Sequence, residues 1–147
     1  MDNPLMRRSV FCYLLSAICY LAFVAQIQIT HTDWKPAPPT LPKGAQVAVL
    51  EGDPKAEGMF TMRIKLPAGS VIPPHWYPRY ERVTVLSGRV IVGFGDKFEK
   101  KGTTFRAGGF YVNPPNVHHY LWIPQESVLQ LTCIGPWELH VVEPLSP

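Results

Sequence analysis

The stretch that decides the fold runs over residues 69–88 and reads GSVIPPHWYPRYERVTVLSG. It carries His75, Tyr77 and Glu81 at fixed intervals between two glycines. Because alternate side chains of a strand share a face, His75 and Tyr77 point the same way if this segment is extended. Glu81 opens the next apolar segment and can enter the same cavity. The spacing therefore predicts an imidazole, a phenol and a carboxyl group gathered inside a β structure.

A second stretch, residues 108–123, reads GGFYVNPPNVHHYLWI and brings a distant histidine, His119. If its strand packs against the first stretch, two imidazoles and one carboxylate converge. Such a set suits Fe(II) and leaves coordination positions open for substrate, although Mn, Ni, Cu and Zn accept the same donors. We therefore predict one divalent metal ion bound by His75, Glu81 and His119, with Tyr77 as a further candidate.

The rest of the chain has the pattern of an all-β protein. Residues 59–66 alternate between an apolar face, with Phe60, Met62, Ile64 and Leu66, and a polar face. Residues 81–86 and 89–94 are expected to form a strand pair around a short turn at Ser87-Gly88. Further strands are expected at residues 46–50, at Phe105 and at residues 110–112, 119–123, 128–134 and 139–142, and Phe110 is expected to pack in the barrel. Short strands separated by turn residues predict a β-sandwich or barrel.

The two stretches resemble the two sequence motifs of the cupin superfamily, in order and in spacing. The first matches G-x5-H-x-H-x3-4-E-x6-G, except that Tyr77 replaces the second histidine. The second matches G-x5-P-x-G-x2-H-x3-N at Gly108, Pro114 and His119, with Asn116 in place of the internal glycine and Ile123 in place of the final asparagine. This spacing selects His119 and not its neighbour His118. Asparagine tolerates a positive φ better than most residues, so this exchange is physically reasonable.

The resemblance covers residues 46–142 and implies the fold and the kind of site. It implies a single antiparallel cupin barrel, also called a double-stranded β-helix or jelly roll. It further implies a metal bound by four residues, of which this chain keeps three, a small organic molecule as ligand, and pairing into a homodimer.

Tyr77 stands where the resemblance implies a fourth ligand, and three roles are open to it. It can bind the metal as phenolate, hydrogen-bond a metal-bound water, or fill the space left by the imidazole. A neutral tyrosine has a pKa near 10 and is a poor ligand until a metal lowers it. We therefore favour a role beside the ligands over direct coordination, and we leave a catalytic role for Tyr77 open.

Residues 1–28 differ in character from the rest of the chain. Arg7 and Arg8 precede an uncharged apolar run over residues 10–24, which is the pattern of an export signal. The cleavage site is poor, because a cut after Ala25 places Phe23 where a small residue is needed. We expect a signal peptide or membrane anchor, and hence a periplasmic, extracellular or membrane-anchored protein.

The amino-acid composition gives three further expectations, which concern the segment before the barrel, the surface charge and the cysteine outside the leader. Four prolines between residues 29 and 45 indicate an extended linker, with Trp34 as an anchor onto the barrel domain of residues 46–147. The formal charge is +3 and no basic run is longer than the pair Lys100-Lys101, so the clustered positive face that a nucleic-acid groove requires is not expected. Cys133 is the one cysteine outside the leader and lies in an apolar run, so we expect a buried, inert thiol.

Three functions follow from these features. The first is a metal-dependent enzyme that performs an oxygenase, isomerase or lyase step on a small organic molecule. The second is a non-catalytic module that binds or senses a metal or a small ligand. The third is a degenerate barrel without metal. The fold alone does not choose among them, because function resides in the site.

Overall fold

The computed structural model describes residues 29–142, and its barrel lies in the unit that begins at Thr32. The described residues form nine strands and no helix. The strands are β1 (Lys35–Pro36), β2 (Gln46–Glu51), β3 (Gly58–Leu66), β4 (Val71–Trp76), β5 (Glu81–Phe94), β6 (Thr103–Arg106), β7 (Phe110–Asn113), β8 (His119–Gly135) and β9 (His140–Val141). The all-β prediction is thus confirmed for this part of the chain.

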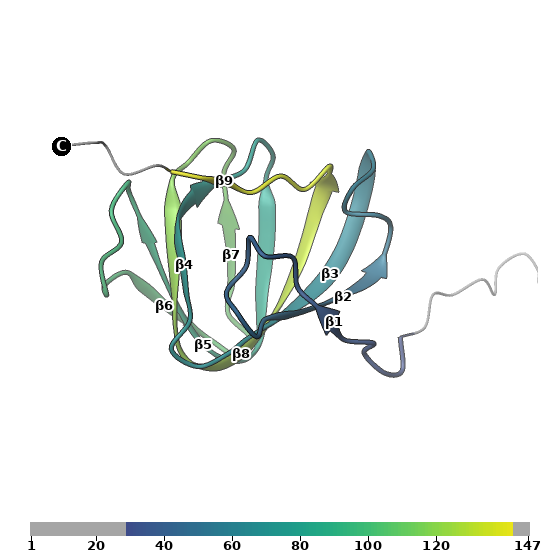
Figure 1. Ribbon diagram of the computed structural model, residues 1–147, viewed down its shortest axis with the longest axis horizontal. Helices are drawn as coiled ribbons and strands as arrows, with labels where there is room; N and C mark the ends of the chain where they lie inside the picture. The colour runs from purple at the N-terminus through teal and green to yellow at the C-terminus, as the bar shows by residue number, and fades with distance from the viewer. Residues whose placement is uncertain (1–28, 143–147) are drawn as a thin grey trace, which may run out of the picture. The chain divides into compact units, whose positions relative to one another are not determined.

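Every strand pairing is antiparallel, and two long strands hold the barrel together. The first half of β8 pairs with β4 and the second half with β3, while β5 follows β8 along most of its length. Figure 1 shows β5 and β8 bending at the base and so passing from one wall of the barrel to the other. Strands β6 and β7 add to the outer side of β5.

The core lies between the two walls and follows the predicted alternation. Phe60, Met62, Ile64 and Leu66 of β3 are buried, as expected, and the residues between them are half-buried. They pack with the inward side chains of β5 and β8, among them Val83, Val85, Leu121, Leu129 and Leu131. Burial of this apolar surface is the main stabilising term for a barrel that lacks disulfides among its described residues.

The predicted hairpin at Ser87-Gly88 is wrong, because β5 continues through these residues as one strand. Gly88 has φ 81° and sits where the register of β5 against β8 shifts. The side-chain hydroxyl of Ser127 accepts a hydrogen bond from the Arg89 amide at 2.9 Å and donates to the Arg89 carbonyl at 3.1 Å. The glycine thus makes a bulge that bends the strand around the barrel rather than a turn that reverses it. Likewise, the two strands expected at 119–123 and 128–134 are parts of β8.

The proline-rich segment before β2 packs against the barrel. Strand β1 pairs with β2, and Leu41 and Ala45 are buried in the core. Trp34 contacts the barrel as expected, with the Lys65 ammonium 4.7 Å from the centre of a Trp34 ring. The predicted leader, residues 1–28, lies outside the described residues, and residues 29–142 contain no helix long and apolar enough to cross a membrane.

Candidate functional site

The register of two strand pairs brings the predicted site residues together. His75, near the end of β4, is directly opposite His119, the first residue of β8, and their ring centres are 4.2 Å apart. Glu81, the first residue of β5, is directly opposite Asn113, the last residue of β7. Figure 1 shows the arrowheads of β4 and β7 at the same end of the barrel, so both pairs meet there.

Asn113 links the two pairs. Its Nδ2 donates to Glu81 Oε2 at 2.8 Å and lies 2.9 Å from His119 Nε2. Glu81 Oε2 and His119 Nε2 are themselves 3.9 Å apart. These three side chains and that of His75 are all buried. One amide group therefore serves as the hydrogen-bond donor to both a carboxylate oxygen and an imidazole nitrogen.

The backbone contacts of both histidines favour the tautomer whose Nε2 can bind a metal. His75 Nδ1 donates to the carbonyl of Pro73 at 2.7 Å, and His119 Nδ1 donates to the carbonyl of Val117 at 3.0 Å. A neutral imidazole that donates through Nδ1 keeps its lone pair on Nε2. Backbone carbonyls hold metal-binding histidines in this way in many proteins.

Burial keeps the cluster close to neutral. It lowers the pKa of His75 to about 3, with the nearby His119 adding to the effect, and it also lowers the pKa of His119. Burial raises the pKa of Glu81 to about 7, although hydrogen bonds from Asn113 and Trp137 oppose the rise. No positive charge balances the carboxylate of Glu81 when it is ionised, because its only ion-pair partner among residues 29–142 is the neutral His119.

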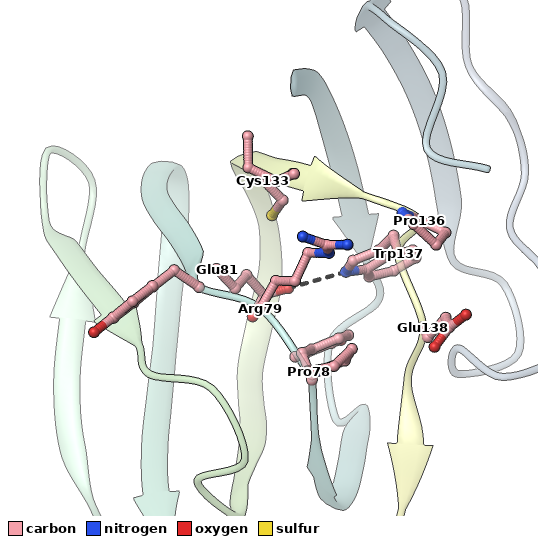
Figure 2. Close-up of a pocket in the computed structure, with 10 residues that line it drawn as sticks. Pro78, Arg79, Glu81, Cys133, Pro136, Trp137 and Glu138 are labelled. Carbon is pink, nitrogen blue, oxygen red and sulfur yellow. Dashed lines mark hydrogen bonds between the residues drawn. The ribbon is translucent and has the colours of Figure 1, made fainter. Parts of the chain in front are cut away.

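Tyr77 and Trp137 close the site on one side. Tyr77 is buried, meets the His75 ring edge-on at 5.3 Å between centres, and stacks on Trp137 at 5.6 Å. Burial, together with the nearby Glu81, raises the pKa of the Tyr77 phenol well above its usual value, so it is neutral. Figure 2 shows the Trp137 indole directed at Glu81 in a small pocket that Arg79 also lines. The indole Nε1 lies 3.4 Å from Glu81 Oε1.

Two further cavities adjoin these residues. Inside the barrel, a space of about 20 Å³ lies among His75, Tyr77, Glu81 and apolar core side chains, which is enough for one water molecule. Outside, a mainly apolar groove of about 670 Å³ lies between the proline-rich segment and β2. Trp137 lines this groove while its indole nitrogen faces Glu81, so it is a shared wall between groove and site.

The residues present fit a divalent metal by the chemistry of their donors. Residues 29–142 contain no group of three His, Cys, Asp or Glu side chains already spaced to hold an ion. Yet the rings of His75 and His119 are 4.2 Å apart between centres, and Asn113 Nδ2 lies within hydrogen-bonding distance of both His119 Nε2 and Glu81 Oε2. The Oδ1 atom of Asn113 is buried and has no hydrogen-bond partner, so the cluster also contains one unused oxygen donor.

The other predictions from single residues have mixed outcomes. Cys133 is buried, as expected, and burial raises the pKa of its thiol to about 12. His118 faces away from the cluster and contacts Asp96 at 2.6 Å. Asn116 has φ 60°, in line with its position at the motif glycine. Phe110, expected to pack in the barrel, is instead 56% exposed.

Sequence reasoning missed Asn113 and Trp137. A signal for Asn113 was present, because it lies two residues after Tyr111 and so shares the inward face of β7. A polar residue on the inward face of a short strand is unusual unless it has a partner. No comparable pattern marks Trp137, which follows β8 in an irregular segment.

Comparison with known proteins assigns the chain to a family. Residues 24–138 match the family model described as the ChrR cupin-like domain. The chain belongs to this cupin family. The resemblance inferred from the two motifs is thereby confirmed, and the antiparallel barrel agrees with it.

Individual relatives support the cupin fold. Germin-like protein 3-1 of Oryza sativa subsp. japonica is 42% identical over 69 residues, which cover 46% of this chain and 31% of that protein. The polyketide cyclase RemF of Streptomyces resistomycificus superposes with a TM-score of 0.64 at 14% identity, over 83% of this chain and 87% of that one. A putative acetylacetone dioxygenase of Methylibium petroleiphilum superposes with a TM-score of 0.62 at 24% identity, over 82% of this chain and 85% of that one. At these identities the solved structures show a shared fold.

Proposed function

We propose that this cupin binds one divalent metal ion through His75, Glu81 and His119 and acts on a small organic molecule. The observation that carries the proposal is the pair of buried histidines. Each donates through Nδ1 to a backbone carbonyl and so keeps its Nε2 lone pair, and each is neutral near pH 7. Neutral imidazole is the form of histidine that binds metals.

The charge balance of the site supports the same proposal. Glu81 is buried beside two neutral imidazoles, and its donors are the uncharged groups of Asn113 and Trp137. Burying a carboxylate without a cation is costly, whereas a divalent ion would supply the missing positive charge. A metal would therefore stabilise the ionised form of Glu81 at neutral pH.

The residues around the cluster suggest how a reaction would be organised. A divalent metal, when bound, supplies Lewis-acid polarisation of a substrate oxygen. Trp137 and Tyr77 exclude water from the same side, and Trp137 fixes one oxygen of Glu81. The relatives named as a dioxygenase and a cyclase act on small organic molecules according to their names, which supports an oxygenase-, isomerase- or lyase-type step here.

The groove beside Trp137 is the place that we assign to the organic part of the substrate. Its volume of about 670 Å³ falls within the usual range of ligand sites, and its lining is mostly Pro, Val, Met and Leu side chains. The inner cavity of about 20 Å³ is too small for a whole organic molecule. On this proposal the body of the substrate lies in the groove. Trp137 must then shift so that the reacting group of the substrate can reach the cluster.

The metal content of purified protein tests the proposal. The full chain is prepared without a His-tag or chelator, loaded anaerobically with Fe(II), desalted, and its bound metal measured by mass spectrometry. We expect about one metal per chain in the wild type and in His118→Ala, and little in His119→Ala. The neighbouring His118 is a matched control because its side chain contacts Asp96 outside the cluster. Absence of metal in the wild type, or its retention in His119→Ala, would contradict the proposal.

A metal-free barrel that binds a small ligand is the second candidate. Asn113 favours it, since one amide satisfies both Glu81 and His119 without an ion. This function predicts that no metal accumulates under the loading just described. It also predicts that apolar small molecules quench the fluorescence of Trp137 in the groove equally well before and after chelation.

We further infer, from the sequence alone, that the protein is exported or membrane-anchored through residues 1–28 and forms a homodimer. Fractionation of expressing cells tests the first inference, since the protein should appear in the periplasm, the medium or the membrane fraction. Light scattering during gel filtration tests the second. A cytosolic location or a monomer mass would contradict them separately.

A further inference from the structure

Asn113 makes a hydrogen bond that competes with metal binding. An imidazole has two ring nitrogens, and His119 commits Nδ1 to the Val117 carbonyl. Its one remaining lone pair, on Nε2, faces Asn113 Nδ2 at 2.9 Å. One lone pair cannot accept a hydrogen bond and coordinate an ion at the same time. The Asn113 amide must therefore give up this bond whenever His119 binds a metal through Nε2.

The other end of the same amide is unused. Asn113 Oδ1 is buried and has no hydrogen-bond partner among the described residues, which is a costly state for a carbonyl oxygen. Rotation about the terminal side-chain bond exchanges Oδ1 and Nδ2 without moving the backbone of β7. Torsions of this type have broad, low barriers compared with sp³–sp³ bonds. Half a turn would thus replace a donor facing Glu81 and His119 with an acceptor.

We propose that the Asn113 amide rotates when the metal binds and that its Oδ1 becomes the fourth ligand, in place of the imidazole that Tyr77 replaces. Amide oxygens are accepted ligands of hard divalent cations. In the metal-free protein, the Asn113 amide holds Glu81 and His119 together by two hydrogen bonds. In the loaded protein, Glu81 and His119 would be held through the ion instead of through these two hydrogen bonds. This inference rests on the metal site proposed above.

The inference predicts the opposite change in metal affinity from the simpler view that Asn113 only competes with the metal for His119. If Asn113 were merely a competing donor, its replacement by leucine, which has a similar shape, would free the His119 lone pair and tighten metal binding. If Oδ1 is a ligand, Asn113→Leu weakens binding. We expect a loss of about tenfold or more in affinity, in the range seen when polar partners of metal sites are removed. Asn113→Asp keeps the oxygen and should bind at least as tightly as the wild type.

Zinc titration of the full chain provides the affinities. Zn²⁺ is added in competition with a chromophoric chelator to the wild type, Asn113→Leu and Asn113→Asp, with circular dichroism to confirm that each variant is folded. We expect Asn113→Asp to bind Zn²⁺ at least as tightly as the wild type, and Asn113→Leu to bind it much more weakly than the wild type. An Asn113→Leu protein that binds Zn²⁺ as tightly as the wild type, or more tightly, overturns the inference. Failure of the wild type to bind Zn²⁺ overturns both this inference and the proposed metal site.

A measurement on the wild type does not depend on the variants folding. A hydrogen bond from Asn113 Nδ2–H to His119 Nε2 allows a scalar coupling between the two nitrogens, which NMR detects in ¹⁵N-labelled protein. We expect the coupling in the metal-free protein and its loss at one equivalent of Zn²⁺, together with a large shift of His119 Nε2. If His119 Nε2 reports bound zinc while the side-chain carbonyl carbon of Asn113, followed in ¹³C-labelled protein, keeps its metal-free chemical shift, Oδ1 is not a ligand and the inference is wrong.

Discussion

The buried carboxyl group of Glu81 should give the metal-free protein an unusual dependence of stability on pH. Burial raises the pKa of Glu81 to about 7 from its ordinary 4.5, against the opposing hydrogen bonds of Asn113 and Trp137. The folded state thus holds the proton more tightly than the unfolded chain does. The stabilisation is fully present below about pH 4.5, falls as pH rises, and is lost above about pH 7.

The size of the effect follows from the two pKa values. Between about 7 and 4.5, at about 1.4 kcal/mol for each pH unit, the wild type loses roughly 3 kcal/mol of unfolding free energy. Glu81→Gln keeps the shape of the side chain and removes its titration. His75, whose pKa is lowered to about 3, acts in the opposite direction, since its contribution is lost as pH falls from about 6.5. That contribution is present in both proteins and largely cancels in the comparison.

Urea unfolding of both proteins at a series of pH values, with a chelator present, measures the difference. We expect the unfolding free energy of the wild type to fall relative to that of Glu81→Gln by roughly 3 kcal/mol between pH 4.5 and pH 7. A difference that stays constant over this interval would refute the reasoning. It would mean that the donors around Glu81 outweigh its burial and keep it ionised throughout.

Three further predictions concern single positions. Gly88→Ala should lower the free energy of unfolding in urea by about 2 kcal/mol or more, because Gly88 has φ 81° and an added methyl group would overlap Ser127. An unchanged urea midpoint would show that a side chain at this position does not strain the bulge. Cys133 should react with thiol reagents only in denaturant, because it is buried with a pKa of about 12; rapid labelling of the native protein would contradict this. Tyr77→His should raise Zn²⁺ affinity by adding an imidazole beside His75; unchanged affinity would show that position 77 does not face the ion.

The sequence predicts the fold well where a pattern and a motif agree. The alternation of residues 59–66 identifies β3 and its buried face, because the side chains of a strand have a period of two. The spacing of His75, Glu81 and His119 anticipates their meeting at one end of the barrel. It also selects His119 over His118, whose side chain faces Asp96.

The continuity of the long strands could not be read from the sequence. A glycine with positive φ occurs both in two-residue turns and in bulges, and only the pairing partner distinguishes them. Gly88 belongs to a bulge because β8 runs beside β5 on both sides of it, and that contact depends on residues about 40 positions away. Local pattern analysis has no access to such a partner.

The composition of the site was only partly predictable for a similar reason. The motif names its ligands but is silent about Asn113, which reaches Glu81 and His119 through the register of β5 and β7. Trp137 reaches Glu81 from beyond the end of β8, across 56 residues of sequence. Both residues act through tertiary contacts, so their roles became visible only in the assembled barrel.

The most direct test of the central claim is a crystal of the protein grown with Zn²⁺ or Mn²⁺ and measured at the absorption edge of that metal. The account predicts a single strong anomalous peak inside the barrel, within bonding distance of Nε2 of His75, Nε2 of His119 and the carboxylate of Glu81. A metal-loaded crystal whose only peaks lie at surface histidines such as His118 or His140 would contradict it.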